Sequence, residues 1–221
     1  MLEMRNVSKR YRTSTVETRA ISGLNLSVKE GEFVAVVGPS GSGKTTFLNV
    51  AGLLESFDTG SYHLDGEDVT KLNDQQRSRL RNQKIGFVFQ NFNLIPDLNV
   101  FDNVDVPLRY QRVRATKRKQ LVESALDRVG LSGRIRHLPG QLSGGQQQRA
   151  AIARALVGKP RLLLADEPTG NLDSNTASGV FDLILDLHRS GSTVLMVTHE
   201  QSMAANASRS IQIRDGMLHS N

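Results

Sequence analysis

Cysteine is absent from this chain of 221 residues, which excludes disulfide bonds, zinc sites built from thiolates and cysteine nucleophiles. Long apolar runs are lacking too. The longest uninterrupted one, Phe33–Val37, has five residues, whereas a membrane-spanning helix needs about 18. The first residues, MLEMRNVSKRY, lack the apolar stretch of a secretory signal. The 38% hydrophobic and 23% charged content is that of a globular protein, and we expect a cytoplasmic one.

Positive charge is concentrated in one segment. Residues 77–119 hold ten Lys or Arg and three Asp, a surplus of +7 (10 − 3), so the other 178 residues of the +6 chain sum to −1. The surplus alone would favour nucleic-acid binding, but the segment lacks the interleaved aromatic residues of a base-stacking surface, and we expect no nucleic-acid partner. Two interpretations remain open: a solvated helix surface, or peripheral contact with anionic lipid headgroups.

Four short apolar runs indicate the main sheet. They are continuous rather than alternating, which is typical of parallel strands buried on both faces: Phe33–Val37, Ile85–Phe89, Leu162–Ala165 and Thr193–Val197. Between them, a helical period of apolar residues predicts helices over residues 117–129, 146–157 and 174–190. Strands that alternate with helices predict an α/β fold.

Two parts of the chain depart from this alternation. Residues 1–37 and 58–71 contain half-alternating pieces, which predict an antiparallel β subdomain beside the main sheet. The segment from about 91 to 156 has helical and loop patterns only, which predicts an inserted helical subdomain. We therefore predict a single domain over residues 1–221, with an α/β core at about 1–90 and 157–221.

A phosphate-binding loop follows the first of these strands. Gly38-Pro-Ser-Gly-Ser-Gly-Lys44-Thr45-Thr46 matches GxxxxGK[ST] at every fixed position. Glycines let backbone N–H groups approach phosphates, and the next helix directs its positive end at them. Lys44 is expected to reach the β- and γ-phosphates and Thr45 to bind Mg²⁺. The predicted nucleotide-binding residues of the loop are Gly38, Ser40, Gly41, Ser42, Gly43, Lys44, Thr45 and Thr46.

Titratable side chains follow two of the other strands. Asp166 and Glu167 come directly after one run, and His199 comes shortly after another. The carboxyl ends of parallel strands face the ligand crevice, so we expect Asp166 to bind Mg²⁺ and Glu167 to orient and polarise the attacking water. We expect His199 to sense the γ-phosphate and the other four histidines to be structural.

A second anion-binding pattern is present in Leu142-Ser-Gly-Gly-Gln146-Gln-Gln-Arg149, where a serine and two glycines precede a helix. One triphosphate needs only one such loop, so the second implies a phosphate supplied by another subunit. Together with the phosphate loop before it and the Asp-Glu strand after it, this LSGGQ sequence resembles the ATP-binding-cassette (ABC) superfamily over essentially the whole chain.

The resemblance implies a P-loop ATPase core with a mostly parallel sheet, an antiparallel β subdomain and a helical subdomain. It implies ATP and Mg²⁺ as cofactors and an ATP-dependent homodimer that closes head to tail. The implied catalytic residues are Lys44, Gln90, Glu167 and His199, and the implied metal-binding residues are Thr45, Gln90 and Asp166. Further nucleotide contacts are implied for Tyr11, Ser143, Gly144, Gly145, Gln146 and Asp173. For Tyr11, which would stack on adenine, a surface tyrosine on a strand remains the alternative.

The residues of two motifs narrow the resemblance to one group within the superfamily. Ala165-Asp-Glu-Pro-Thr-Gly-Asn-Leu-Asp173 and Phe89-Gln-Asn-Phe-Asn-Leu-Ile-Pro96 are similar to ATPases of lipoprotein-releasing, macrolide-exporting and cell-division complexes. This implies a separate integral membrane permease and a place at the cytoplasmic face of the inner membrane. The complex would use ATP hydrolysis to power export, lipoprotein extraction or mechanical work. We expect docking through residues near Gln90–Arg114, on an apolar face made of Phe92, Leu94, Ile95, Leu98 and Val100. Core packing of the helical subdomain is the alternative for some of these side chains.

Two other functions are open to the same superfamily. A regulatory or scaffolding subunit of a cell-division-type complex would bind ATP chiefly to assemble, and the intact Glu167 and His199 argue against a purely structural role. A chromosome-maintenance ATPase would need a long coiled coil between Lys44 and Ser143, and that interval has no sustained heptads.

Overall fold

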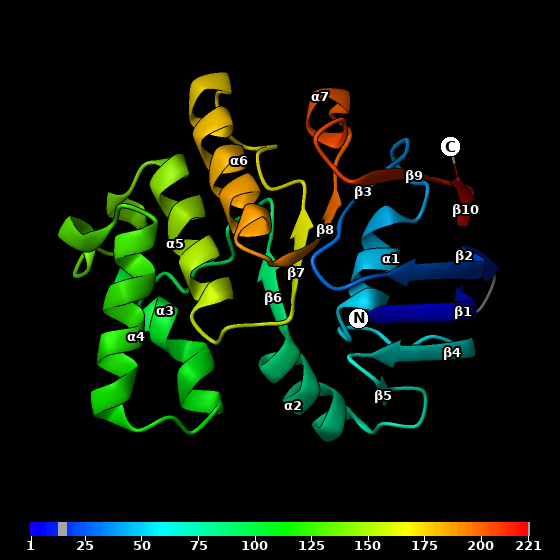
Figure 1. Cartoon of the computed structure of the whole chain (residues 1–221), viewed down its shortest axis with the longest axis horizontal. Coiled ribbons are helices and arrows are strands. Elements are labelled where there is room, and N and C mark those ends of the chain that lie inside the picture. The colour runs from blue at the N-terminus through cyan, green and yellow to red at the C-terminus, as the bar shows by residue number, and fades with distance from the viewer. Residues whose placement is uncertain (13–16, 221) are drawn as a thin grey trace.

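The computed structural model describes residues 1–12 and 17–220. Its centre is a six-stranded sheet in the order β10-β9-β3-β8-β7-β6 (Figure 1). The pairs from β9 to β6 are parallel and β10 runs antiparallel to β9, so the predicted mostly parallel α/β fold is confirmed. The strands are β3 (Phe33–Val37), β6 (Ile85–Val88), β7 (Leu162–Asp166), β8 (Thr193–Val197), β9 (Arg209–Arg214) and β10 (Met217–Ser220).

The predicted antiparallel strands form a second sheet in the order β2-β1-β4-β5. These strands are β1 (Leu2–Arg12), β2 (Glu17–Val28), β4 (Thr59–Leu64) and β5 (Glu67–Asp68). Helix α1 (Lys44–Ala51) lies against β2 on one side and against β7 and β8 on the other. Its buried Phe47 and Leu48 thereby join both sheets in one apolar cluster.

Most helices lie on the other face of the parallel sheet. They are α3 (Val100–Tyr110), α4 (Ala115–Arg128), α5 (Gly144–Leu156) and α6 (Ser174–Arg189), with the 3₁₀ turns η1 (Ser132–Arg134) and η2 (Pro139–Gln141) between α4 and α5. On β7, Leu162 and Leu164 face the α1 side, whereas Leu163 and Ala165 pack with the helices. The strands are therefore buried on both faces, which is why their apolar runs are continuous.

The helices predicted over residues 117–129, 146–157 and 174–190 correspond to α4, α5 and α6. Helix α2 (Asp74–Lys84) was not predicted. Only Leu80 is buried among its residues, so it shows no apolar period, and it begins instead with a capping box between Asn73 and Gln76. The hairpin of β9 and β10 was missed as well, although Asp215 and Gly216, both at positive φ, are a recognised two-residue hairpin turn.

The C-terminal side of β8 leads into the short helix α7 (Gln201–Ala204). Within residues 1–12 and 17–220, no helix has the length and apolar character needed to cross a membrane.

A buried carboxylate ties α3 to α4. Asp105 on α3 is only 2% exposed and accepts hydrogen bonds from Arg109 Nε (2.7 Å) on its own helix and Arg118 Nε (2.8 Å) on α4. A carboxylate removed from water needs such partners. Arg118 would lose its counter-charge without Asp105, whereas Arg109 also pairs with Asp102 (2.8 Å). This ion triad fixes the crossing of the two helices.

We expect Asp105→Ala to lower the free energy of unfolding by about 2–4 kcal/mol, because it leaves the Arg118 guanidinium without its acidic partner and removes one of the two carboxylates that pair with Arg109. Glu123→Ala is the matched control on α4, since Glu123 makes a longer and more exposed contact with Lys119 (3.9 Å) and should cost under about 1 kcal/mol. Urea denaturation of both variants gives the comparison. Equal losses would mean that the triad contributes nothing beyond a surface ion pair.

Candidate functional site

The phosphate loop connects β3 to α1 and depends on its glycines. Gly43, at the N-terminus of α1, has φ 101°, and a Cβ there would lie 2.3 Å from the carbonyl oxygen of Ala20. No other residue fits this position. Lys44 is 9% exposed, and its ammonium group donates to the carbonyl oxygens of Gly38 and Pro39 (2.8 Å each). The Ser42 hydroxyl is buried without a hydrogen-bond partner among the described residues. Free N–H groups, a held ammonium and an orphan hydroxyl fit a phosphate chain.

Tyr11 lies on β1 beside this loop and is 39% exposed. Its hydroxyl donates to Glu55 Oε2 and contacts the side chain of Thr46 on α1. Partial burial, together with the Glu55 carboxylate, raises the pKa of Tyr11. Lys9 lies over the ring, with its Nζ 5.5 Å from the centroid. The ring is thus near the first turn of α1, where stacking on adenine remains a prediction.

Two acidic residues end β7. Burial raises the pKa of Asp166, and the negative charge of Glu167 raises it further, while Lys44 opposes the shift. Lys44 and Asp166 therefore act on each other across the loop. A carboxylate in such a position gains from a nearby cation, which suits the predicted metal role.

Glu167 has an unusual backbone. Its φ is +42°, which costs energy for any residue with a side chain. The Glu167 N–H donates to the carbonyl oxygen of Val197 on β8 (2.9 Å), and its carboxylate lies 3.1 Å from His199 Nδ1. The structure therefore brings together the predicted residues Glu167 and His199 from adjacent strands.

Gln90 follows β6 and is held against the loop after β7. Its Nε2 donates to Asn171 Oδ1 (3.3 Å), and Asn171 Nδ2 donates back to the Gln90 carbonyl oxygen (3.1 Å). The sequence alone did not predict a contact between Asn171 and Gln90. Asn171 belongs to one of the quoted motifs, but 81 residues separate it from Gln90 in the chain, so no local spacing indicates the contact.

The LSGGQ sequence forms the start of α5. Ser143 is the exposed N-cap, and it exchanges a capping box with Gln146 (3.1 and 3.3 Å). Gly145 is buried against α6, where a Cβ would come within 2.1 Å of Thr176 Cγ2. Asp173 caps α6 by accepting from the Thr176 N–H, a bond that lowers the pKa of Asp173. These residues form one surface, and their helices cover the opposite face of the sheet from α1.

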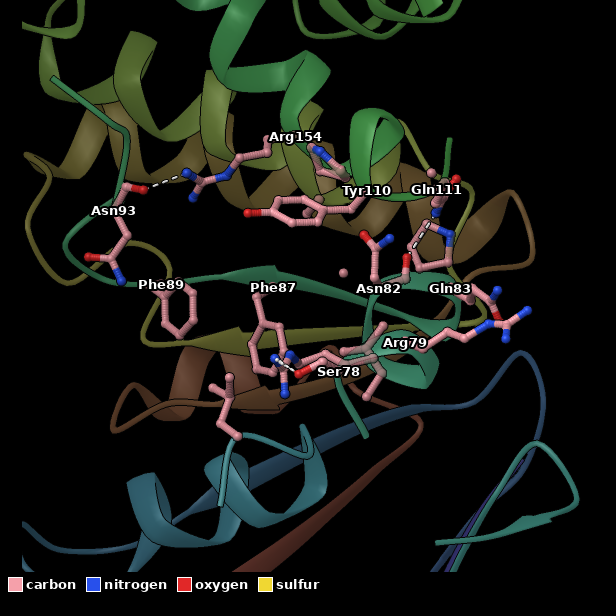
Figure 2. Close-up of a pocket in the computed structure, with 18 of the residues that line it drawn as sticks. Ser78, Arg79, Asn82, Gln83, Phe87, Phe89, Asn93, Tyr110, Gln111 and Arg154 are labelled. Carbon is pink, nitrogen blue, oxygen red and sulfur yellow. Dashed lines mark hydrogen bonds between the residues drawn. The ribbon is translucent and has the colours of Figure 1, made fainter. Parts of the chain in front are cut away.

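A groove of about 960 Å³ lies between α2, β6 and the ends of α3 and α5 (Figure 2). Phe87 and Phe89 stack in it with ring centroids 5.2 Å apart, and Tyr110, 77% exposed, lies across from them. No Asp or Glu is among the described residues that line it. Its cationic residues are Arg79, Arg81, Arg112 and Arg154.

Arg154 is the most enclosed of these arginines, and burial lowers its pKa. Its guanidinium donates to the carbonyl oxygens of Phe92 (2.9 Å) and Asn93 (Figure 2). Both acceptors belong to residues at positive φ, so Arg154 holds an otherwise strained stretch of the loop after Gln90.

The predicted docking face of Phe92, Leu94, Ile95, Leu98 and Val100 is separate from this groove, because none of these five residues lines it. Ile95 is 42% exposed, and docking of a permease on this face stays a prediction. Val100 is fully buried, and Leu94 packs against the helical core. The missed lining comes from α2 and from the end of α3. Because α2 was not predicted, no sequence signal placed its arginines beside Gln90.

Comparisons with known proteins agree with this geometry. A family model described as ABC transporter matches residues 21–170. An uncharacterized ABC transporter ATP-binding protein, YvrO of Bacillus subtilis (strain 168), is 46% identical over 99% of this chain and 95% of its own length. The macrolide export ATP-binding/permease protein MacB of Hyphomonas neptunium is 42% identical over 99% of this chain, which spans 34% of that protein.

Solved structures give the same result. The dimeric post-hydrolysis state of the ATP-binding cassette MJ0796, bound to ADP and Pi, superposes with a TM-score of 0.91 at 40% identity. The superposition covers 100% of this chain and 98% of that one. With the phosphate loop, the Asp166–Glu167 strand end and the LSGGQ helix in their expected places, the chain belongs to the ABC transporter family of ATP-binding proteins.

Proposed function

We propose that the chain hydrolyses ATP in a Mg²⁺-dependent reaction and powers a membrane permease. The observation that carries the proposal is the pair of Glu167 and His199, 3.1 Å apart at the strand ends beside Asp166 and Lys44. A carboxylate held by an imidazole, next to a phosphate loop, is suited to activating water for phosphoryl transfer.

Each residue of this site would then have its own role in ATP hydrolysis. Bound MgATP supplies an electrophilic γ-phosphorus and a cation that neutralises phosphate charge. The N–H groups at the start of α1 and the Lys44 ammonium bind the phosphates. Thr45, Asp166 and Gln90 would hold the metal. Glu167 orients the attacking water and accepts its proton, while His199 fixes the Glu167 carboxylate.

An ATP-dependent homodimer would complete the site. Ser143 is exposed at the N-terminus of α5, and its helix belongs to the apolar cluster on the opposite face of the sheet from α1. The N-terminus of a helix favours anions, so Ser143 to Gln146 would meet the nucleotide of a second chain, with Asp173 at the same interface. The dimeric state of the MJ0796 cassette supports this arrangement.

We further propose that the groove beside Gln90 receives the permease. MacB combines ATP-binding and permease parts in one protein, and this chain matches about a third of it. Aromatic rings and four arginines suit a short helix with apolar and acidic side chains. This would place the chain at the cytoplasmic face of a membrane, driving export, lipoprotein extraction or mechanical work.

Glu167→Gln should lower ATP turnover by about 10²-fold or more while ATP binding remains, because the amide cannot accept a proton from water. Phosphate release and fluorescent-nucleotide titration measure the two properties. Glu200→Gln makes the same charge change directly after His199 and should keep near-parental turnover. Parental turnover in Glu167→Gln would refute its assigned role, and a parental chain without turnover would favour a scaffold.

The purified chain should be a monomer without nucleotide, and the Glu167→Gln variant should dimerise with ATP. Ser143→Arg, introduced into that variant, should abolish the dimer and keep nucleotide binding, since Ser143 would meet the nucleotide of the partner and not the one bound by its own chain. Light scattering gives the mass, and nucleotide titration gives the affinity. A stable dimer without nucleotide, or lost binding in monomeric Ser143→Arg, would contradict the two-chain site.

Tyr110→Ala should weaken the binding of a membrane permease that co-purifies with the parental chain and leave the basal ATPase unchanged, because Tyr110 is exposed in the groove. Met217→Ala removes an apolar side chain on β10 that is 47% exposed and lies outside the groove, and this variant should retain the permease. Co-purification of the complex and phosphate release from the isolated chain are the measurements. Equal loss of both activities would show that Tyr110 supports the fold instead.

A further inference from the structure

Gln148 has a position that the proposed mechanism does not explain. It lies on α5 five residues after Ser143 and is 0% exposed. Its neighbours on the buried side of α5 are small or apolar, among them Ala151 and Ile152. A buried amide among such residues costs free energy unless its polar atoms are used.

The amide of Gln148 bridges the two catalytic loops. Its Nε2 donates to the carbonyl oxygen of Phe89 (3.3 Å) and to that of Pro168. Phe89 directly precedes Gln90, and Pro168 directly follows Glu167. One side chain therefore holds the backbone on both sides of the reaction centre, at the ends of β6 and β7.

The amide oxygen of Gln148 is buried without a hydrogen-bond partner among the described residues. Side chains selected only for packing rarely retain such an atom, because an apolar side chain of similar volume avoids its desolvation penalty. The two hydrogen bonds that Gln148 Nε2 donates therefore explain why an amide, rather than an apolar side chain, occupies this position.

The hydrogen bonds of Gln148 matter because one of them holds the backbone next to Glu167. Its strained backbone at φ +42° persists only if its surroundings hold it. The Val197 carbonyl holds its N–H, the Gly170 N–H donates to its carbonyl oxygen (3.0 Å), and Gln148 holds the next carbonyl along the chain. Loss of the Gln148 bond would free the Pro168–Thr169 peptide, which is the next one along the chain after the strained Glu167.

We propose that Gln148 is a positioning residue, which transmits the engagement of Ser143 by a partner's nucleotide along α5 to Glu167 and Gln90. The proposal rests on the ATPase function proposed above. Helix α5 holds the loop after β6 at both ends, through Gln148 at Phe89 and through Arg154 at Phe92 and Asn93. A shift of the helix therefore moves both catalytic loops together.

The test compares Gln148→Met and Gln148→Glu with the parental chain. Methionine keeps the volume and removes the donors, and glutamate keeps the shape but presents an oxygen to the two carbonyls. Both should lower the kcat for ATP hydrolysis tenfold or more, with the KM for ATP and the nucleotide affinity within about twofold. Gln147→Met is the matched control. The Gln147 side chain donates to the carbonyl oxygen of Leu142, just before α5 (3.2 Å), and to neither of the two loops that Gln148 holds.

A double variant separates positioning from packing. In the Glu167→Gln background, Gln148→Met should lower the residual turnover by much less than tenfold, because the part of its effect that acts through the Glu167 carboxylate is already lost. A tenfold further loss would overturn the proposal. So would parental kcat in both single variants, or loss of folding in both by circular dichroism, which would assign Gln148 to the core. If the parental chain itself fails to hydrolyse ATP, the proposed function is what fails.

Discussion

The parallel register of β3, β8, β7 and β6 is the constraint on which the site depends. It brings four strand ends to one edge, so that residues separated by more than 100 positions in the chain become neighbours. Lys44 acts on Asp166 there, and Glu167 pairs with His199. A slip of β7 by one residue would exchange its two faces, moving Leu163 and Ala165 out of the helical cluster. The catalytic geometry and the core are therefore specified by the same hydrogen-bond ladder.

Burial on both faces of the sheet also divides the nucleotide site. Helix α1 belongs to the cluster shared with the antiparallel sheet, whereas α5 and α6 belong to the helical cluster. The phosphate loop and the Ser143 end of α5 are thus carried by different layers. Gln148 reaches between them, since it is anchored on α5 and donates to carbonyls at the strand ends. At the predicted catalytic residues, α5 is joined to the strand ends by these two hydrogen bonds, which can respond to a movement of the helix more readily than close-packed apolar side chains can.

Some of this was predictable because the chemistry requires particular residues at fixed local spacing. The phosphate loop needs Gly43 and Lys44 directly after a strand, and the acidic pair needs a buried strand before it. Gln148 could not be assigned in this way, because its acceptors are backbone carbonyls 59 and 20 residues away, and a carbonyl carries no residue identity. Helix α2 was missed because it is held by its cap and by charge rather than by an apolar stripe.

In the folded chain, the positive charge of the basic segment, residues 77–119, is divided between ion pairs and the groove. Its surplus is neutralised in part by acids that lie outside residues 77–119: Arg77 pairs with Asp74, Lys84 with Asp65 and Lys119 with Glu123. Arg109 and Arg118 share Asp105 within it. Three of the remaining arginines, Arg79, Arg81 and Arg112, line the groove beside Gln90 together with Arg154. A diffuse lipid-facing surface would leave its cations spread over the exterior. The gathering of four arginines in the groove of stacked Phe87 and Phe89, with no acid among the described residues that line it, instead favours one compact acidic partner. Arg81 and Arg154 are partly desolvated, and such a guanidinium gains most from a carboxylate brought into the same groove.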